Sequence, residues 1–155
     1  MRTVYTPVME QVVNGATLIV LDNADQWAQQ WDSIYAYQAV QYNGSRNLGG
    51  GGRLFVGRST LLTGLPVSQS MNWEYQVFYR KNIGGLDIGR IGNETVVALA
   101  SQSRSDILTA VARIPFGRGR IIVNTLTMLP ELGSERPQSA MAKKLFLNFI
   151  EYAKK

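Results

Sequence analysis

The stretch over residues 109–126 constrains the fold more than any other part of the chain. Two runs with apolar side chains at alternating positions flank a short basic turn, and this period of two is that of a β-strand. Gly117 and Gly119 are typical of a tight hairpin turn, where they allow backbone angles that a side chain would oppose. Pro115 lacks an N–H for the ladder and belongs where the pairing ends. The second run is apolar on most of both faces, so we expect an antiparallel hairpin in a sheet that helices cover.

The chain before the hairpin predicts alternating helices and strands. A short helix over Thr6–Val13 should stop at Asn14-Gly15, and residues 16–21 should form a buried, parallel strand. A long helix is expected over about residues 24–42, followed by a flexible glycine-rich loop over residues 43–52.

The remaining segments complete a single α/β domain over residues 1–155. We expect a short strand at 53–57, a turn at 59–66 with Leu61, Leu62 and Leu65 as apolar anchors, a strand beginning within 67–79, turns at 83–90, a strand at 95–101, polar loops at 102–106 and 128–135, and a closing helix at 136–155. The sum is five or six strands in a three-layer, partly parallel sheet that is flanked by helices and ends in the antiparallel hairpin.

Missing residue types exclude several classes of chemistry. The chain has no cysteine, which excludes disulfides, thiol nucleophiles and thiolate metal sites. It has no histidine, which removes the usual general base, the imidazole metal ligand and every Ser-His-Asp triad. Catalysis would have to rest on carboxylates, lysine, tyrosine or a cofactor. We therefore expect a non-catalytic chain with no metal and no cofactor.

The charge pattern argues against nucleic-acid and membrane partners. The net charge is +5 and the pI is about 9.7, but the basic residues are scattered and do not interleave with aromatic residues. No apolar run reaches the length of a membrane span, and residues 1–20 lack the layout of a signal peptide. This indicates a cytoplasmic protein or a segment of a longer exported chain.

Asp22 and Asn23 are the first candidate ligand-binding residues. They follow the strand predicted at 16–21, and ligands of open α/β sheets bind where a strand's carboxyl end meets the next helix. Asn23 with Gln26 also resembles a capping box, and we favour this capping role. In the helix that follows, Trp27 and Trp31 share one stripe, which could be a sugar platform but is more typical of core packing.

The cluster Asn72-Trp73-Glu74-Tyr75 is the second candidate site. It combines ring faces with hydrogen-bonding groups, which is the combination that a sugar site uses. Glu74 could act there as a general acid or accept hydrogen bonds from sugar hydroxyls. The alternative, which we favour, is a half-buried structural motif. In that case truncation of Trp73 to Ala would cost about 3–5 kcal/mol of stability.

Several of these segments resemble a known family. Residues 13–21 (VNGATLIVL) look like the step into a strand of class I glutamine-amidotransferase-like domains. Residues 63–66 (TGLP), 72–76 (NWEYQ) and 115–122 (PFGRGRII) resemble the version of that domain appended to family-2 glycoside hydrolases. That version is similar to β-galactosidase trimerisation and trehalose-utilisation domains. The end of the closing helix fits the same pattern, and the resemblance covers most of residues 10–153.

The resemblance implies an amidotransferase-like or flavodoxin-like fold, shortened at its N-terminus. An amidotransferase needs a cysteine and a histidine that this chain lacks, so no catalytic residue is carried over. The implied function is that of a non-catalytic accessory domain of a carbohydrate-active enzyme, structural or oligomerising. Its partners would be the catalytic module of a periplasmic or secreted bacterial parent, or a second copy, with glycan as a candidate ligand. The alternatives are a stand-alone carbohydrate-binding module and an enzyme that acts on sugar through Glu74 and an aspartate.

Overall fold

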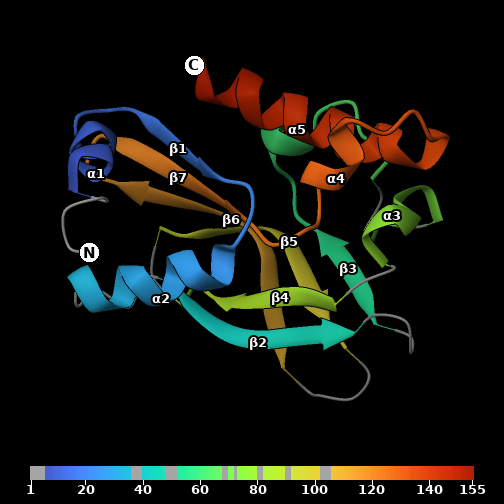
Figure 1. Ribbon diagram of the computed structural model, residues 1–155, viewed down its shortest axis with the longest axis horizontal. Helices are drawn as coiled ribbons and strands as arrows, with labels where there is room; N and C mark the ends of the chain where they lie inside the picture. The colour runs from blue at the N-terminus through green and yellow to red at the C-terminus, as the bar shows by residue number, and fades with distance from the viewer. Residues whose placement is uncertain are drawn as a thin grey trace.

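The computed structural model describes residues 6–35, 40–47, 52–67, 70–71, 73–79, 82–89, 92–101 and 106–155. These residues form a mixed α/β fold around one seven-stranded sheet (Figure 1). In chain order the elements are α1 (Thr6–Val13), β1 (Thr17–Val20), α2 (Ala24–Tyr35), β2 (Gln41–Asn47), β3 (Arg53–Val56), α3 (Gln76–Tyr79), β4 (Asn82–Asp87), β5 (Glu94–Ala100), β6 (Ile107–Phe116), β7 (Gly119–Asn124), α4 (Leu129–Leu132) and α5 (Ala140–Ala153), with 3₁₀ turns at Thr60–Leu62, Trp73–Tyr75 and Pro137–Ser139.

The predicted hairpin is confirmed as strands β6 and β7. They pair antiparallel from Val111 opposite Asn124 to Phe116 opposite Gly119. The strand predicted at 16–21 is confirmed as β1, which pairs parallel with β7, but it lies at the edge of the sheet and only Val20 of it is buried. Strands β3 and β5, expected at 53–57 and 95–101, pair with each other, and β5 pairs with β6. The hairpin is therefore the centre of the sheet.

Strand β6 carries two different neighbours along one of its edges. Strand β5 occupies the other edge from Ile107 to Arg113. Strand β7 pairs with the second half of β6, whereas β4 meets its first half at Thr109, opposite Leu86. Strand β2 then pairs with β4 on the outside. The edge of β6 thus forks into a β7–β1 branch and a β4–β2 branch.

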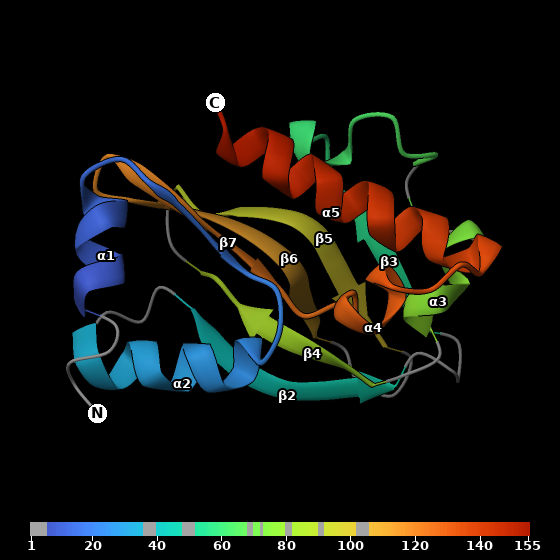
Figure 2. The ribbon, with the colours of Figure 1, turned by 45° about the horizontal axis from the view of Figure 1, so that its top comes forward.

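Helices cover both faces of the sheet, as the two-sided apolar pattern of β7 predicts (Figure 2). Ile122 faces α5 and packs in one core with Leu145 and Phe149. Its neighbours Ile121 and Val123 face the other way and share a second core with residues of α1 and α2, among them Met9, Val12 and Trp27. Within the described residues no helix is long and apolar enough to cross a membrane.

The two glycines of the hairpin turn have different roles. Gly117 has a φ of 61°, in the left-handed region that favours glycine. Gly119 is needed for space instead, since a Cβ atom there would lie 2.2 Å from the carbonyl oxygens of Val12 and Ala16. The turn is held against the end of α1 by a hydrogen bond from the Arg118 N–H to the Val13 carbonyl, at 2.9 Å. The expectation that both glycines serve backbone angles is therefore correct for Gly117 only.

Three expected elements are wrong, and two of them lie in the β4–β2 branch. The described part of the long helix ends at Tyr35, and Gln41–Asn47 forms β2 where the end of that helix and a glycine-rich loop were expected. The turns expected at 83–90 are largely strand β4, and the strand expected within 67–79 is instead a 3₁₀ turn followed by α3. The sequences of β2 (QYNGSRN) and β4 (NIGGLD) have weak strand propensity, so their pairing with each other and with β6 decides their structure.

The remaining expectations are largely confirmed. The turn at 59–66 buries all three leucine anchors, Leu61, Leu62 and Leu65. The closing helix consists of the turn Pro137–Ser139 followed by α5, and the loop at 128–135 contains the single-turn helix α4. Residues 48–51 of the glycine-rich loop and 102–105 of the polar loop lie outside the described residues.

Candidate functional site

A pocket of about 190 Å³ lies at the fork in the sheet. It is lined by residues that follow β1 and β7 and by residues of β2 and β4: Leu21, Asp22, Asn23, Ala24, Asp25, Tyr42, Ser45, Asn82, Gly84, Asn124, Thr125, Leu126 and Thr127. We call it the fork pocket. It opens at the carboxyl ends of the parallel strands β1 and β7, the edge at which open α/β sheets bind ligands.

The sequence placed Asp22 and Asn23 correctly at this edge. The Asp22 carboxylate accepts a hydrogen bond from the Asn23 N–H at 2.9 Å, and the Asn23 carbonyl accepts one from the N–H of Trp27 at 3.0 Å. Asn23 has a φ of 52°, and it stands directly before α2, where a capping residue would stand. Asp25 lies in the first turn of α2, where the helix dipole favours its negative charge.

A bulge in β2 supplies the opposite wall of the fork pocket. The pairing of β2 with β4 shifts register between Tyr42 and Ser45. Residues three apart on a regular strand point to opposite faces, but the irregularity turns both Tyr42 and Ser45 to the pocket. The buried Arg46 holds this bulge, because its guanidinium donates to the carbonyl oxygens of Asn43 at 2.9 Å and Ser45 at 3.2 Å and pairs with Asp106 at 2.5 Å.

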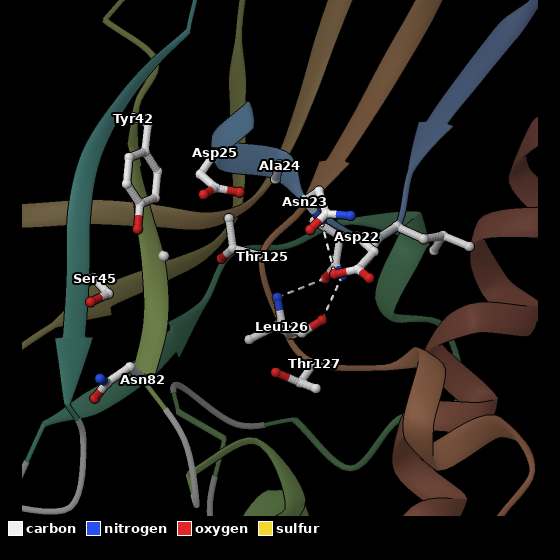
Figure 3. Close-up of a pocket in the computed structure, with 13 residues that line it drawn as sticks. Asp22, Asn23, Ala24, Asp25, Tyr42, Ser45, Asn82, Thr125, Leu126 and Thr127 are labelled. Atoms are coloured by element: carbon white, nitrogen blue, oxygen red, sulfur yellow. Dashed lines mark hydrogen bonds between the residues drawn. The ribbon is translucent and has the colours of Figure 1, made fainter. Parts of the chain in front are cut away.

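Gly84 of β4 makes room for the side chains that border the pocket. A Cβ atom at this position would lie 3.0 Å from Cε2 of Tyr42 and 3.5 Å from the side chain of Thr125. The Thr125 hydroxyl donates to the Ala110 carbonyl at 3.1 Å, which fixes its rotamer. Figure 3 shows Tyr42, Asp25 and Thr125 around one space, and it shows Asn82, the first residue of β4, farther along the same pocket. The pocket is therefore shaped by fixed side chains.

Asn124 holds the floor of the fork pocket together. Its side chain is 1% exposed and donates to the carbonyl oxygens of Leu21 at 3.2 Å and Leu126 at 2.7 Å. It also accepts a hydrogen bond from the Leu126 N–H at 3.2 Å. These bonds join the end of β1 to the segment after β7. The Asn124 amide thus positions the backbone of the pocket and has little capacity left for a ligand.

The second candidate cluster divides between core and surface. Tyr75 is fully buried and donates a hydrogen bond to the Pro66 carbonyl at 3.3 Å, whereas Trp73 is 74% exposed. Asn72 lies outside the described residues. Burial, followed by the nearby charge of Glu74, raises the pKa of Tyr75 to about 12. The structural interpretation therefore fits Tyr75, but the expectation that Trp73 is buried is wrong.

Trp73 borders a groove of about 440 Å³, which we call the Trp73 groove. Arg53, Met71, Gln76 and Tyr79 line it as well. The Tyr79 hydroxyl is committed to the backbone, since it donates to the Met71 carbonyl at 2.5 Å and accepts from the Leu54 N–H at 3.2 Å. The groove therefore presents the exposed ring of Trp73 beside two long side chains that can form hydrogen bonds, those of Arg53 and Gln76.

The other sequence candidates do not form a site. Trp27 is 6% exposed and packs in the core, so it is not a sugar platform, and the side chain of Trp31 lies outside the described residues. One oxygen of the Glu74 carboxylate is buried without a hydrogen-bond partner in the described part of the chain. The described residues include no group of three or more acidic side chains that could hold a metal ion.

Sequence reasoning missed most of the fork pocket. Tyr42 and Ser45 were assigned to a helix end and a loop, and Asn82 was assigned to no element, so only the sheet pairing brings them together. Thr125 could have been found, because it follows β7 in the same way that Asp22 follows β1, and the same rule applies to both strand ends.

No protein-family model matches the chain. A search of curated proteins likewise finds no significant match.

Proposed function

We propose that the chain is a non-catalytic accessory domain of a carbohydrate-active enzyme, with an amidotransferase-like fold, and that it contacts glycan through the Trp73 groove. The single observation that carries this proposal is the 74% exposure of Trp73. An exposed tryptophan costs hydration free energy, and its flat ring is suited to the apolar face of a pyranose.

The neighbours of Trp73 support the same ligand class. Arg53 and Gln76 supply donors and an acceptor at the edge of the ring, which is what sugar hydroxyls require. The groove opens to the surface beside the exposed ring of Trp73, as suits a chain of sugars that passes over the surface. The resemblance of residues 63–66 and 72–76 to domains appended to family-2 glycoside hydrolases supports the same proposal.

The proposed partners are the catalytic module of a parent glycoside hydrolase or a second copy of the chain. A non-catalytic role agrees with a sequence that lacks histidine and cysteine. The stand-alone carbohydrate-binding module remains the second candidate, and the same exposed tryptophan favours it. The two differ in one measurement: a stand-alone module would bind glycan with the same affinity alone and linked, whereas an accessory domain would bind weakly alone and more tightly once linked to its catalytic partner.

A Trp73→Ala variant tests the proposal by thermal unfolding together with binding to a glycan array. Because Trp73 is mostly exposed, we expect a stability loss under about 1 kcal/mol, with glycan binding lost. Leu147→Ala is the matched control, since Leu147 is 55% exposed on α5 and lies outside the groove. Glycan binding that survives in Trp73→Ala, or a parent chain that binds no glycan, would contradict the proposal.

A further inference from the structure

We infer that the fork pocket is a second binding site, for one small neutral polyhydroxylated ligand of monosaccharide size. The inference rests on the proposed association with carbohydrate and adds a site to it. The fork pocket and the Trp73 groove share no lining residue, so each can be disabled without the other.

The size of the pocket sets the size of its ligand. Its volume of about 190 Å³ lies below the range of about 300–1,000 Å³ that is usual for drug-sized ligands. A dinucleotide or an oligosaccharide would not fit inside it. A single sugar ring is of the right order, and the open groove at Trp73 would hold the longer chain.

The lining determines the chemistry of the ligand. Of the described residues that line the pocket, Asp22 and Asp25 are charged, and none is a lysine or an arginine. This negative lining disfavours phosphate and carboxylate ligands, although the N-terminus of α2 points there. The carboxylates are acceptors for the hydroxyls of a vicinal diol, to which they form strong charge-assisted hydrogen bonds.

The remaining side chains complete a sugar-like environment. Ser45 and Thr125 carry hydroxyls, and Asn82 carries an amide with both donors and an acceptor. Tyr42 contributes a ring whose position is set by Gly84, and such a ring can pack on the apolar face of a pyranose. Together the carboxylates, the amide, the hydroxyls and the ring match a neutral polyol better than an anion.

Hydrogen bonds hold the backbone around the pocket in place, and such preorganisation lowers the cost of binding a small ligand. Arg46 holds the β2 bulge that presents Tyr42 and Ser45. Asn124 joins the two strand ends that carry Asp22 and Thr125. Neither residue needs to touch the ligand, so both are positioning residues for the site.

The test is titration of the full chain with D-galactose, D-glucose and D-xylose, followed by two-dimensional amide NMR. Inorganic phosphate and Ca²⁺ are titrated in parallel as probes of the competing ligand classes. We expect at least one monosaccharide to shift the amide signals of Asn82, Thr125 and Thr127. In Asp25→Asn, which keeps the shape of the side chain, the dissociation constant should rise about tenfold or more, as expected for loss of a hydrogen bond to a charged group.

Two further variants make the outcomes decisive. Ser45→Ala removes only a hydroxyl that lines the pocket, so it should leave the fold intact and weaken binding, and it replaces Asp25→Asn if that variant does not fold. Trp73→Ala should leave the monosaccharide shifts at the fork pocket unchanged, even where it abolishes glycan-array binding. Shifts in the fork pocket with phosphate or Ca²⁺ alone, shifts confined to the Trp73 groove, an unchanged constant in Asp25→Asn, or no shifts with any sugar would each overturn the inference.

Discussion

The two branches of the forked sheet differ in what holds them in place. Strand β7 is buried along its second half, pairs with β6 over six residues and carries β1 in parallel. Strand β4 meets β6 at one pair, Leu86 and Thr109, and carries the bulged strand β2. Apolar packing on two faces fixes the first branch, whereas glycines, a buried arginine and polar contacts shape the second.

This difference explains why the pocket lies at the fork. The pairing of β7 with β6 ends at Asn124, where the chain turns away from the sheet. Beyond that point β4 pairs with the same edge of β6. The polar side chains of the second branch then face the ends of β1 and β7 across a gap. A continuous apolar sheet would have filled this space with core residues. The tightly packed branch supplies the two carboxylates at the end of β1, whereas the loosely specified branch supplies the opposite polar wall of the pocket.

The largest expected change in stability comes from a glycine of the β7 branch, and a glycine of the β4 branch is the comparison. In Gly119→Ala the new Cβ atom would meet two backbone carbonyl oxygens at 2.2 Å, and backbone cannot move aside cheaply. We expect a loss of at least about 3 kcal/mol, or about 6–12 °C in melting temperature for a chain of this size. In Gly84→Ala the closest atom is the ring carbon of Tyr42 at 3.0 Å, so the loss should be about 1 kcal/mol.

Differential scanning calorimetry on both glycine variants measures this contrast. Gly133→Ala is the control, since nothing lies within 4 Å of a Cβ atom there. Equal losses of stability in the Gly119 and Gly84 variants would contradict the distinction between a tightly packed branch and an adaptable one.

An intermediate effect is expected from the buried arginine of the second branch. Arg46→Met leaves the carbonyl oxygens of Asn43 and Ser45 without their charged donor and removes the pair with Asp106. We expect a loss of about 2 kcal/mol, measured by urea unfolding, together with weaker monosaccharide binding at the fork pocket. Arg58→Met, at an exposed position, is the matched control and should change neither quantity. Lost stability with unchanged sugar binding would show that the bulge does not position the pocket.

The smallest effects belong to the basic side chains of the hairpin turn. The Arg120 guanidinium lies 4.7 Å from the ring centroid of Tyr152, so Arg120→Ala should cost about 0.5–1 kcal/mol. Arg118 makes an exposed contact with Asn14 at 3.4 Å, and Arg118→Ala should leave the melting temperature nearly unchanged. A loss from Arg118→Ala as large as that from Arg120→Ala would contradict this ranking.

The pH dependence of Arg120→Ala gives an independent check. Burial raises the pKa of Tyr152, but hydrogen bonds from Arg120 and Arg113 and their charges outweigh it, so the pKa is lowered overall. The stabilisation is therefore present above the unfolded pKa of about 10 and is lost as the pH falls through the folded pKa. Arg120→Ala should cost more stability above pH 10 than at pH 7, and ultraviolet titration should show a raised tyrosine pKa in this variant.

Trp73 and Tyr75 show how much of the second candidate cluster could be predicted from the sequence. The cluster at 72–75 was selected for its aromatic and polar content, but nothing in the order Trp73, Glu74, Tyr75 tells which ring is buried. The 3₁₀ turn places Tyr75 in the core against Phe78 and leaves Trp73 on the surface. A strand over the same residues would have placed both rings on one face.

The sequence by itself determined the β6–β7 hairpin, the parallel strand β1, the closing helix and the position of Asp22 and Asn23 at a strand end. In each case a local period or a turn residue is sufficient, because burial on one or both faces leaves a regular pattern of apolar side chains. Only the tertiary structure decided the β4–β2 branch and the fork pocket. Strands β2 and β4 have few apolar residues and several glycines, so their conformation depends on hydrogen bonds to partners far away in the chain. The pocket is lined by residues between 21 and 127. Long-range strand pairing alone brings them together, so no local sequence pattern predicts the pocket.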